Sequence, residues 1–238
     1  MIMRDPCEGD TLFAKTMNLW LLRQYPSEAH RNRIHYLEER LREETLRARV
    51  RGGRARILSL GCGPAHEIQR FLRNGVLADS AEFTLVDMNE EALQHVRQTL
   101  GEIRQSCGRQ TPVVTQKKSV LQLLRESART PGDGSAGAYD LIYCAGLFDY
   151  LTDRTCKQLL ALLYDQLVPE GLLVATNVDA CRPFRHMLEF LLDWHLTYRN
   201  GAKLKALAPD RVSRNDCGVK SDSTGTNVFL ELRKPGKG

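Results

Sequence analysis

The sequence predicts an α/β fold in which a mostly parallel sheet carries helices on both faces. Three observations predict it: an apolar run that stops at Gly61, a second apolar run that ends in an acid at Asp87, and amphipathic helical segments after each run. A chain of 238 residues, 42% of them hydrophobic, can bury the core that one such domain needs. We expect an N-terminal helical extension or lid over residues 1–53 and the α/β domain over residues 54–238.

The first strand of the predicted sheet runs from Arg56 to Leu60 and leads into a turn that contains Gly61 and Gly63. Glycine admits backbone conformations closed to other residues and lets a ligand approach the main chain. An amphipathic helix follows, and Pro64 suits its first position because proline has no N–H to leave unpaired. The turn is therefore a candidate ligand site, although a plain tight turn has the same sequence signature.

The second strand, Phe83 to Asp87, ends in a carboxylate. An acid at the carboxyl end of the second strand of a βαβ unit can accept both hydroxyls of a ribose. The dinucleotide fingerprint needs a third glycine, but Pro64, Ala65 and His66 follow Gly63. The pattern favours a nucleoside without a pyrophosphate.

These motifs resemble those of the class I S-adenosylmethionine-dependent methyltransferases. The matching segments, between about Arg54 and Asn177, are Leu60-Gly61-Cys62-Gly63-Pro64, Leu85-Val86-Asp87-Met88-Asn89, Tyr139-Asp140-Leu141-Ile142-Tyr143-Cys144 and Leu167-Val168-Pro169-Glu170-Gly171-Leu172-Leu173-Val174. The resemblance implies a Rossmann-like seven-stranded sheet, S-adenosyl-L-methionine as cofactor and S-adenosyl-L-homocysteine as product.

The resemblance also implies a set of cofactor-binding residues. They are Gly61, Cys62, Gly63, Pro64, Asp87, Met88, Asn89, Ser119, Val120, Cys144, Ala145 and Gly146. Ser119 is equally well explained as a helix N-cap, and Cys62 and Cys144 as small residues that fill tight turns. Two positions depart from the family: Ser59 stands where many members carry an acid near the methionine ammonium, and Ala65 where many carry a third glycine.

Two amphipathic helices are predicted before the first strand, over residues 10–22 and 27–50, with Ser27 as N-cap of the second. Aromatic and basic residues on them are lid candidates, although packing alone would also explain them: Trp20, Tyr25, Arg33 and Tyr36. Arg23 to Arg56 carries ten arginines against five glutamates within a net charge of +5, which could attract an anionic partner. We favour a solvated helix face with Glu38–Arg42 and Glu43–Arg47 pairs.

After the second strand, the sequence predicts a helix over 90–100, a strand over 112–116, a helix over 121–125 and an exposed low-complexity loop over 129–138. A fourth strand runs through Tyr143 into the loop 144–153. A helix over 154–167 with Thr152 or Asp153 as cap, a fifth strand over 172–176 and a helix over 183–199 follow. Residues 212–216 and 226–232 predict a closing antiparallel hairpin. Ligands of open parallel sheets bind beyond the strand ends, so loop 144–153 should meet the Gly61 turn.

Three residues near this edge are candidates for a catalytic role: His195, Asp149 and Arg199. A carboxylate acceptor needs only a cation to orient it, whereas a hydroxyl acceptor needs a base within hydrogen-bond reach. His195 on an apolar helix face is more often a satisfied core histidine, and Asp149 could equally hold its own loop.

The loop after the fourth strand lacks the Asn/Asp-Pro-Pro-aromatic motif of related enzymes that methylate planar nitrogens. Instead, residues 143–151, 176–178 and 189–199 resemble bacterial small-molecule methyltransferases that make 3-hydroxy fatty acid methyl esters. This resemblance implies O-methylation of a carboxylate on an acyl chain. The alternatives are an RNA or other nucleic-acid methyltransferase and a non-catalytic nucleoside-binding regulator.

The partner that we expect is a small-molecule acceptor, with nucleic acid disfavoured. No apolar stretch approaches the length of about 20 residues that spans a bilayer, and the first residues lack the apolar core of a signal peptide, so we expect a cytoplasmic protein. The seven cysteines are scattered without a C-x-x-C pair, which predicts neither a disulfide framework nor a metal site.

Overall fold

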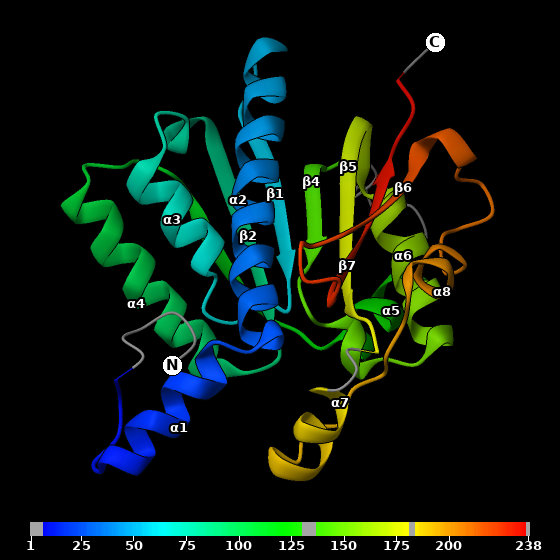
Figure 1. Cartoon of the computed structure of the whole chain (residues 1–238). Coiled ribbons are helices and arrows are strands. Elements are labelled where there is room, and N and C mark those ends of the chain that lie inside the picture. The colour runs from blue at the N-terminus through cyan, green and yellow to red at the C-terminus, as the bar shows by residue number, and fades with distance from the viewer. Residues whose placement is uncertain (1–6, 130–136, 181–183, 237–238) are drawn as a thin grey trace.

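The computed structural model describes residues 7–129, 137–180 and 184–236. Within these ranges the chain forms one seven-stranded sheet with the strand order β3-β2-β1-β4-β5-β7-β6 (Figure 1). The strands are β1 (Ala55–Leu60), β2 (Ala81–Asp87), β3 (Val113–Lys117), β4 (Tyr139–Cys144), β5 (Leu167–Val178), β6 (Cys217–Ser221) and β7 (Asn227–Arg233). β1 to β5 are parallel, and β7 is antiparallel to both β5 and β6. The predicted fold class is confirmed.

Helices cover both faces of the sheet. They are α1 (Leu12–Leu22), α2 (Tyr25–Val50), α3 (His66–Asn74), α4 (Glu90–Ser106), α5 (Val120–Arg129), α6 (Asp153–Asp165), α7 (Phe184–His186) and α8 (Gly201–Lys205). In Figure 1, α2, α3 and α4 lie on the side of the sheet that faces the viewer, and α5 and α6 lie behind it.

The sheet has one hydrophobic core on each face, because successive side chains of a strand point to opposite faces. Ile57 of β1 packs in the core that holds residues of α2, α3 and α4. Leu58, its neighbour, packs in the core beneath α6. β1 and β4 are buried on both sides, which explains why they appear in the sequence as continuous apolar runs.

The predicted helix over 183–199 is wrong. A short α7 passes into a π-turn at Met187–Leu191, and no helix follows before Gly201. Backbone groups of this segment are instead hydrogen-bonded to the rim of the sheet: Thr197 N–H donates to Asp149 O and Arg199 N–H to Val178 O. Those long-range bonds replace the bonds that a helix would make.

Three local predictions also need correction. The hairpin's first strand is β6 at Cys217–Ser221, because residues 214–216 form a 3-10 turn capped by Ser213. Helix α2 begins at Tyr25, and Ser27 does not cap it, since its hydroxyl donates to Leu21 O. Pro64 precedes helix α3, which starts at His66. The predicted cap of α6 at Thr152 is confirmed. The loop predicted over 129–138 lies mostly outside the described residues.

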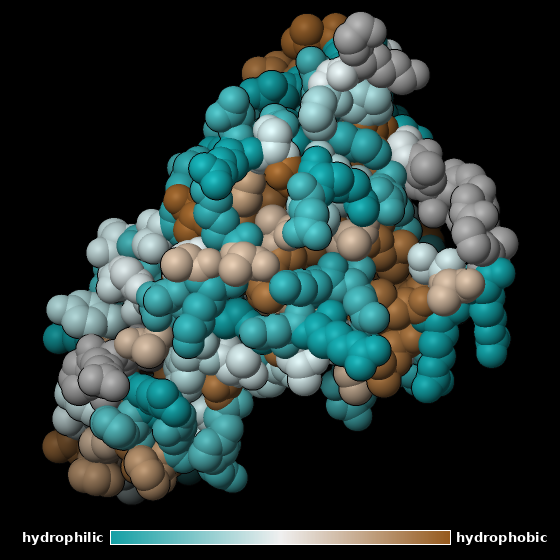
Figure 2. Space-filling view, turned by 90° about the vertical axis from the view of Figure 1, so that its right-hand side faces the viewer, coloured by the Kyte–Doolittle hydropathy of each residue, from teal (hydrophilic) through white to brown (hydrophobic). Residues whose placement is uncertain are grey.

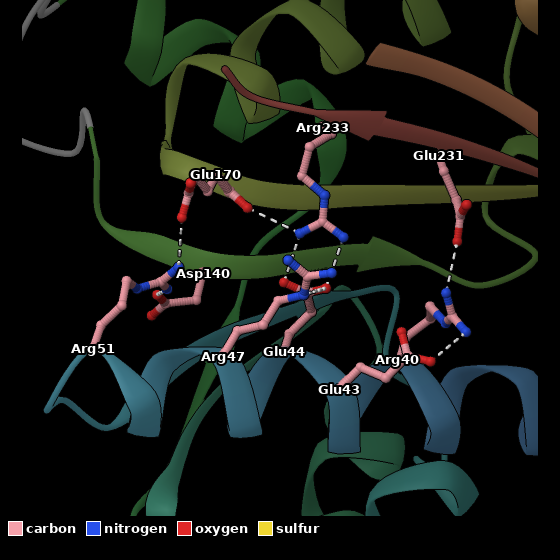
Figure 3. Close-up of polar contacts among 9 residues, drawn as sticks. All are labelled: Arg40, Glu43, Glu44, Arg47, Arg51, Asp140, Glu170, Glu231 and Arg233. Atoms are coloured by element: carbon pink, nitrogen blue, oxygen red, sulfur yellow. Dashed lines mark hydrogen bonds and ion pairs between the residues drawn. The ribbon is translucent and has the colours of Figure 1, made fainter. Parts of the chain in front are cut away.

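Helix α2 is fixed to the sheet by ion pairs (Figure 3). Glu44, 1% exposed, receives two hydrogen bonds from Arg233 of β7 at 2.7 and 2.8 Å. Arg40 pairs with Glu231 of β7 and with Glu43. The expected Glu38–Arg42 pair forms at 2.7 Å, whereas Arg47 contacts Glu44 in place of Glu43. Much of the positive charge of α2 is therefore compensated within the fold.

No helix in the described ranges is long and apolar enough to cross a membrane.

Candidate active site

The glycine turn after β1 has the backbone conformation that the sequence predicts. Gly61 and Gly63 have φ values of +67° and +49°. The N–H groups of Gly61 and Cys62 both donate to Val86 O of β2, at 2.8 and 3.2 Å. A Cβ at Gly63 would meet no atom within 4 Å, so open space lies beside the main chain there. Ala65, where the family often has glycine, also takes a left-handed conformation, with φ +50°.

Asp87 at the end of β2 holds this turn. Its Oδ2 accepts the Gly63 N–H at 2.9 Å, and its Oδ1 accepts the Asn89 N–H at 2.9 Å. A carboxylate can accept about four hydrogen bonds, so each oxygen retains capacity for one more donor. The pair of vicinal hydroxyls on a ribose fits that remaining capacity. The carboxylate therefore fits the role that its position in the sequence predicts.

A cavity of about 270 Å³ lies beside Asp87 at the carboxyl ends of β1, β2 and β4. Seven predicted cofactor residues line it: Gly61, Asp87, Met88, Ser119, Val120, Ala145 and Gly146. We call it the cofactor pocket. Ser119 both lines the pocket and accepts the Gln122 N–H, so its two alternative interpretations are compatible.

Five predicted cofactor residues do not line the cofactor pocket: Cys62, Gly63, Pro64, Asn89 and Cys144. Cys144 is fully buried, and Asn89 caps α4 by accepting the Glu91 N–H. Four residues that line the pocket were not predicted: Leu60, Lys118, Leu147 and Tyr150. Each is close in the chain to a predicted residue, so the motif positions alone could have indicated them.

A buried acid lies behind the turn, close to the departure at Ser59. Glu67 on α3 accepts a hydrogen bond from the Tyr143 hydroxyl at 2.7 Å. Burial raises the pKa of Glu67, and the bond from Tyr143 opposes that shift. Ser59, also buried, is hydrogen-bonded to the same tyrosine. The chain thus carries an acid in this region, although not at the position typical of the family.

A second cavity of about 370 Å³ adjoins the cofactor pocket, and both are lined by Ala145, Gly146 and Tyr150. We call it the acceptor pocket after the role that we propose for it. Its walls are mainly apolar and come from separate segments: Leu21 and Leu22 of α1, Val178 of β5, and Met187, Leu188, Leu192, Trp194 and Leu196. In Figure 1, α1 and α7 lie at the end of the molecule toward which β1 points. Trp194 is held by a 2.7 Å hydrogen bond from its indole nitrogen to Tyr150.

The polar side chains of the acceptor pocket include Arg33, His30 and Asp149. Asp149 is 4% exposed, and burial raises its pKa to about 6. Its Oδ1 accepts the Val178 N–H at 2.7 Å. Asp149 therefore holds its loop and also lines the pocket, and its catalytic role stays a prediction.

The other two candidate catalytic residues lie elsewhere. The His195 side chain is 68% exposed, contacts Asp193 at 3.1 Å and lines neither pocket. Arg199 is 2% exposed, and its guanidinium donates to Phe148 O, Leu151 O and Asn177 Oδ1. It also pairs with Asp153. Arg199 thus fixes the loop that carries Asp149 and does not line either pocket.

Fold and site together describe an α/β protein with two adjoining pockets at the carboxyl ends of its parallel strands. Residues 58–173 match the family model of a methyltransferase domain. No curated protein matches the chain.

Solved structures similar to this chain include methyltransferases. A protein from Bordetella parapertussis, named as a possible exported protein, superposes with a TM-score of 0.73 at 17% identity, over 99% of this chain and 77% of its own. The magnesium protoporphyrin IX methyltransferase of Synechocystis PCC 6803, with bound S-adenosylhomocysteine, superposes with a TM-score of 0.59 at 12% identity, over 98% and 90%. The S-adenosylmethionine-dependent methyltransferase SibL superposes with a TM-score of 0.54 at 19% identity, over 76% and 50%.

At these identities the structural likenesses show the fold. The family match over residues 58–173 indicates a methyltransferase domain, which takes S-adenosyl-L-methionine as its cofactor.

Proposed function

We propose that the protein is an S-adenosylmethionine-dependent O-methyltransferase that acts on a small molecule, the carboxylate of an acyl or related natural-product acid. The observation that carries this proposal is the acceptor pocket, which adjoins the cofactor pocket at Ala145, Gly146 and Tyr150. A substrate in one pocket would meet the cofactor in the other at this shared wall.

The size and lining of the acceptor pocket support a small, largely apolar substrate. A volume of about 370 Å³ lies within the range of small-molecule sites, and aliphatic side chains form most of the walls. Such walls stabilise hydrocarbon by removing it from water. The polar side chains Arg33, His30 and Asp149 give the pocket a distinct polar region that can fix the orientation of the acceptor.

The proposed reaction needs little catalytic apparatus from the protein. The cofactor would supply a methyl group on a sulfonium. An ionised carboxylate oxygen has no proton to lose as the carbon–oxygen bond forms, and the carbon–sulfur bond would break to release S-adenosyl-L-homocysteine. The contribution of the chain is orientation and exclusion of water. Asp87 would hold the ribose, and the apolar walls around Leu188 and Trp194 would exclude water from the acceptor.

A nucleic-acid substrate is less well supported. Arg40, Arg42 and Arg47 of α2 and Arg51, its C-cap, are all engaged in ion pairs within the protein. An arginine-rich surface binds phosphates best when its charges are not already compensated.

The test is a transfer assay with cofactor labelled on the methyl group and 3-hydroxydecanoate as acceptor. Decane-1,3-diol serves as the matched control without a carboxylate, and total RNA as the nucleic-acid control. We expect label in a product that mild alkali hydrolyses, as an ester does, and no label on the diol or RNA. Labelled diol or RNA would contradict the proposal, as would cofactor binding without turnover of any acid in a panel of acyl chain lengths.

A further inference from the structure

Arg33 has a distinctive position in the acceptor pocket. It lies on α2, is partly buried and lines this pocket but not the cofactor pocket. Its Nη1 lies 2.8 Å from the position that a Cβ on Gly146 would occupy. Gly146 is part of the wall that the two pockets share. The guanidinium therefore lies where an acceptor must place its reacting group.

The guanidinium of Arg33 has spare binding capacity. Among the described residues, no carboxylate lies within ion-pair distance of it, although burial next to Asp149 and Glu67 places two acids in its electrostatic environment. Arg40 and Arg42 of the same helix are paired with acids, as Figure 3 shows for Arg40. A guanidinium has five N–H donors, and the one hydrogen bond that Arg33 makes within the described residues uses only one of them.

That one bond orients the guanidinium. Arg33 Nη2 lies 3.0 Å from His30 Nδ1. Arginine can only donate, so His30 Nδ1 must be the acceptor, and the ring is neutral with its proton on Nε2. Burial, followed by the charge of Arg33, lowers the pKa of His30 to about 3, with smaller contributions from His66 and Arg31. His30 thus remains an acceptor for Arg33 at every pH at which the protein would work.

We propose that Arg33, oriented by His30, binds the carboxylate of the acceptor at the inner end of the acceptor pocket. This inference rests on the proposed function and defines the substrate class: a monocarboxylic acid with an apolar body that lies along Leu22, Leu188 and Leu192. Arg33 makes the orientation-fixing contact, and His30 is a positioning residue.

The surroundings of the pocket agree with an amphipathic acid. Exposed apolar side chains follow the pocket residues Met187 and Leu188 in the chain, since Phe190 and Leu191 are 85% and 60% exposed. Figure 2 shows a small group of hydrophobic side chains at the lower left of that view, among hydrophilic ones. One end of the site thus carries the Arg33 guanidinium and the other is apolar, which matches a carboxylate with a hydrocarbon tail.

The alternative ligand for Arg33 is the carboxylate of the cofactor's own methionine, and the experiment separates the two. Decanoate and decan-1-ol are titrated into the protein saturated with S-adenosylhomocysteine, with tryptophan fluorescence as readout because Trp194 lines the pocket. Binding of S-adenosylhomocysteine itself is measured separately by calorimetry. The variants are Arg33→Gln, Arg33→Lys and His30→Phe. Arg42→Gln removes a charge on the same helix away from both pockets and is the matched control.

We expect the wild type and Arg42→Gln to bind decanoate more tightly than decan-1-ol. Arg33→Gln should raise the Kd of decanoate by about tenfold to a hundredfold, which corresponds to the loss of a charge-assisted hydrogen bond. The Kd values of decan-1-ol and S-adenosylhomocysteine should change by no more than about twofold. Arg33→Lys should recover part of the loss, and His30→Phe should cause a smaller loss of the same kind.

Two results would overturn the inference. The first is a wild type that does not prefer the acid over the alcohol. The second is an Arg33→Gln variant with weakened S-adenosylhomocysteine binding and an unchanged preference for the acid, which would assign Arg33 to the cofactor. If acids bind through Arg33 but are never methylated, the proposed function fails and the carboxylate site stands.

Discussion

Replacement of Asp87 by Asn tests the cofactor site most directly. The exchange keeps the size of the side chain but removes its charge and turns one acceptor oxygen into a donor. In the structure each carboxylate oxygen accepts one backbone N–H at 2.9 Å, from Gly63 and from Asn89. The new amide can keep only one of these bonds, and its NH₂ group must face the other N–H.

Two effects of different size follow. Loss of one backbone bond, and of its orientation of the glycine turn, should lower the free energy of unfolding by about 1–2 kcal/mol. Cofactor binding loses more free energy than folding does, because two hydrogen bonds from ribose hydroxyls to a charged carboxylate become at most one such bond to a neutral amide oxygen. We estimate about 3 kcal/mol, which raises the Kd by about two orders of magnitude.

The assay is calorimetric titration with S-adenosylmethionine and S-adenosylhomocysteine, well below the melting temperature of the variant, with NAD as control ligand. Glu90→Gln makes the same chemical change three residues away. Glu90 pairs with Arg97 on the surface and does not line the cofactor pocket. Its variant should bind normally. If Asp87→Asn binds as tightly as the wild type, or if the wild type binds NAD in place of the methionine nucleosides, our account of this site is wrong.

Three further predictions concern stability. Gly63 and Gly108 both have positive φ and open space where a Cβ would lie, so Gly63→Ala and Gly108→Ala should each lower the free energy of unfolding in urea by about 1 kcal/mol. Only Gly63→Ala should weaken S-adenosylhomocysteine binding, and equal binding by both variants would contradict this. Arg233→Met leaves the buried Glu44 without its bidentate partner and should lower the free energy of unfolding by about 3 kcal/mol. Adding Glu44→Met should restore most of that loss, and a double variant as unstable as the single one would show that the loss comes from packing. Burial raises the pKa of Asp149 from 3.8 to about 6, so between these values the unfolded chain has released a proton that the folded chain retains, and stability falls as pH rises. The free energy of unfolding of Asp149→Asn should therefore rise relative to that of the wild type by up to roughly 3 kcal/mol as the pH increases from about 4 to about 7. A difference between the two proteins that does not change with pH would refute this.

The cofactor side of the molecule was largely predictable because its signals are local. A buried strand, a turn that needs positive φ and an acid at the next strand's end lie within one βαβ unit, so their spacing in sequence fixes their place in space. Asp87 accordingly faces the Gly61 turn, and Ala145 and Gly146 lie opposite. The sequence could not show which motif residues face the cavity. Cys144 and Gly146 are two positions apart in one motif, yet Cys144 is buried in the core and Gly146 lines the cavity.

The acceptor side depended on contacts between distant segments. Residues 183–199 have helical periodicity, but their N–H groups bond to Asp149 and Val178, so the segment follows the sheet rim and carries His195 out to solvent. Arg199 is of a residue type that is common in binding sites, but its guanidinium donates to the loop carbonyl of Phe148 instead.

By itself, then, the sequence determined the fold class, the glycine turn and the carboxylate that faces it, because strand burial and turn conformation depend on neighbours in the chain. Only the tertiary structure decided what the acceptor meets. Arg33 and Asp149 come from segments far apart in sequence, and the burial that brings them to one pocket is a property of packed elements that no local pattern encodes.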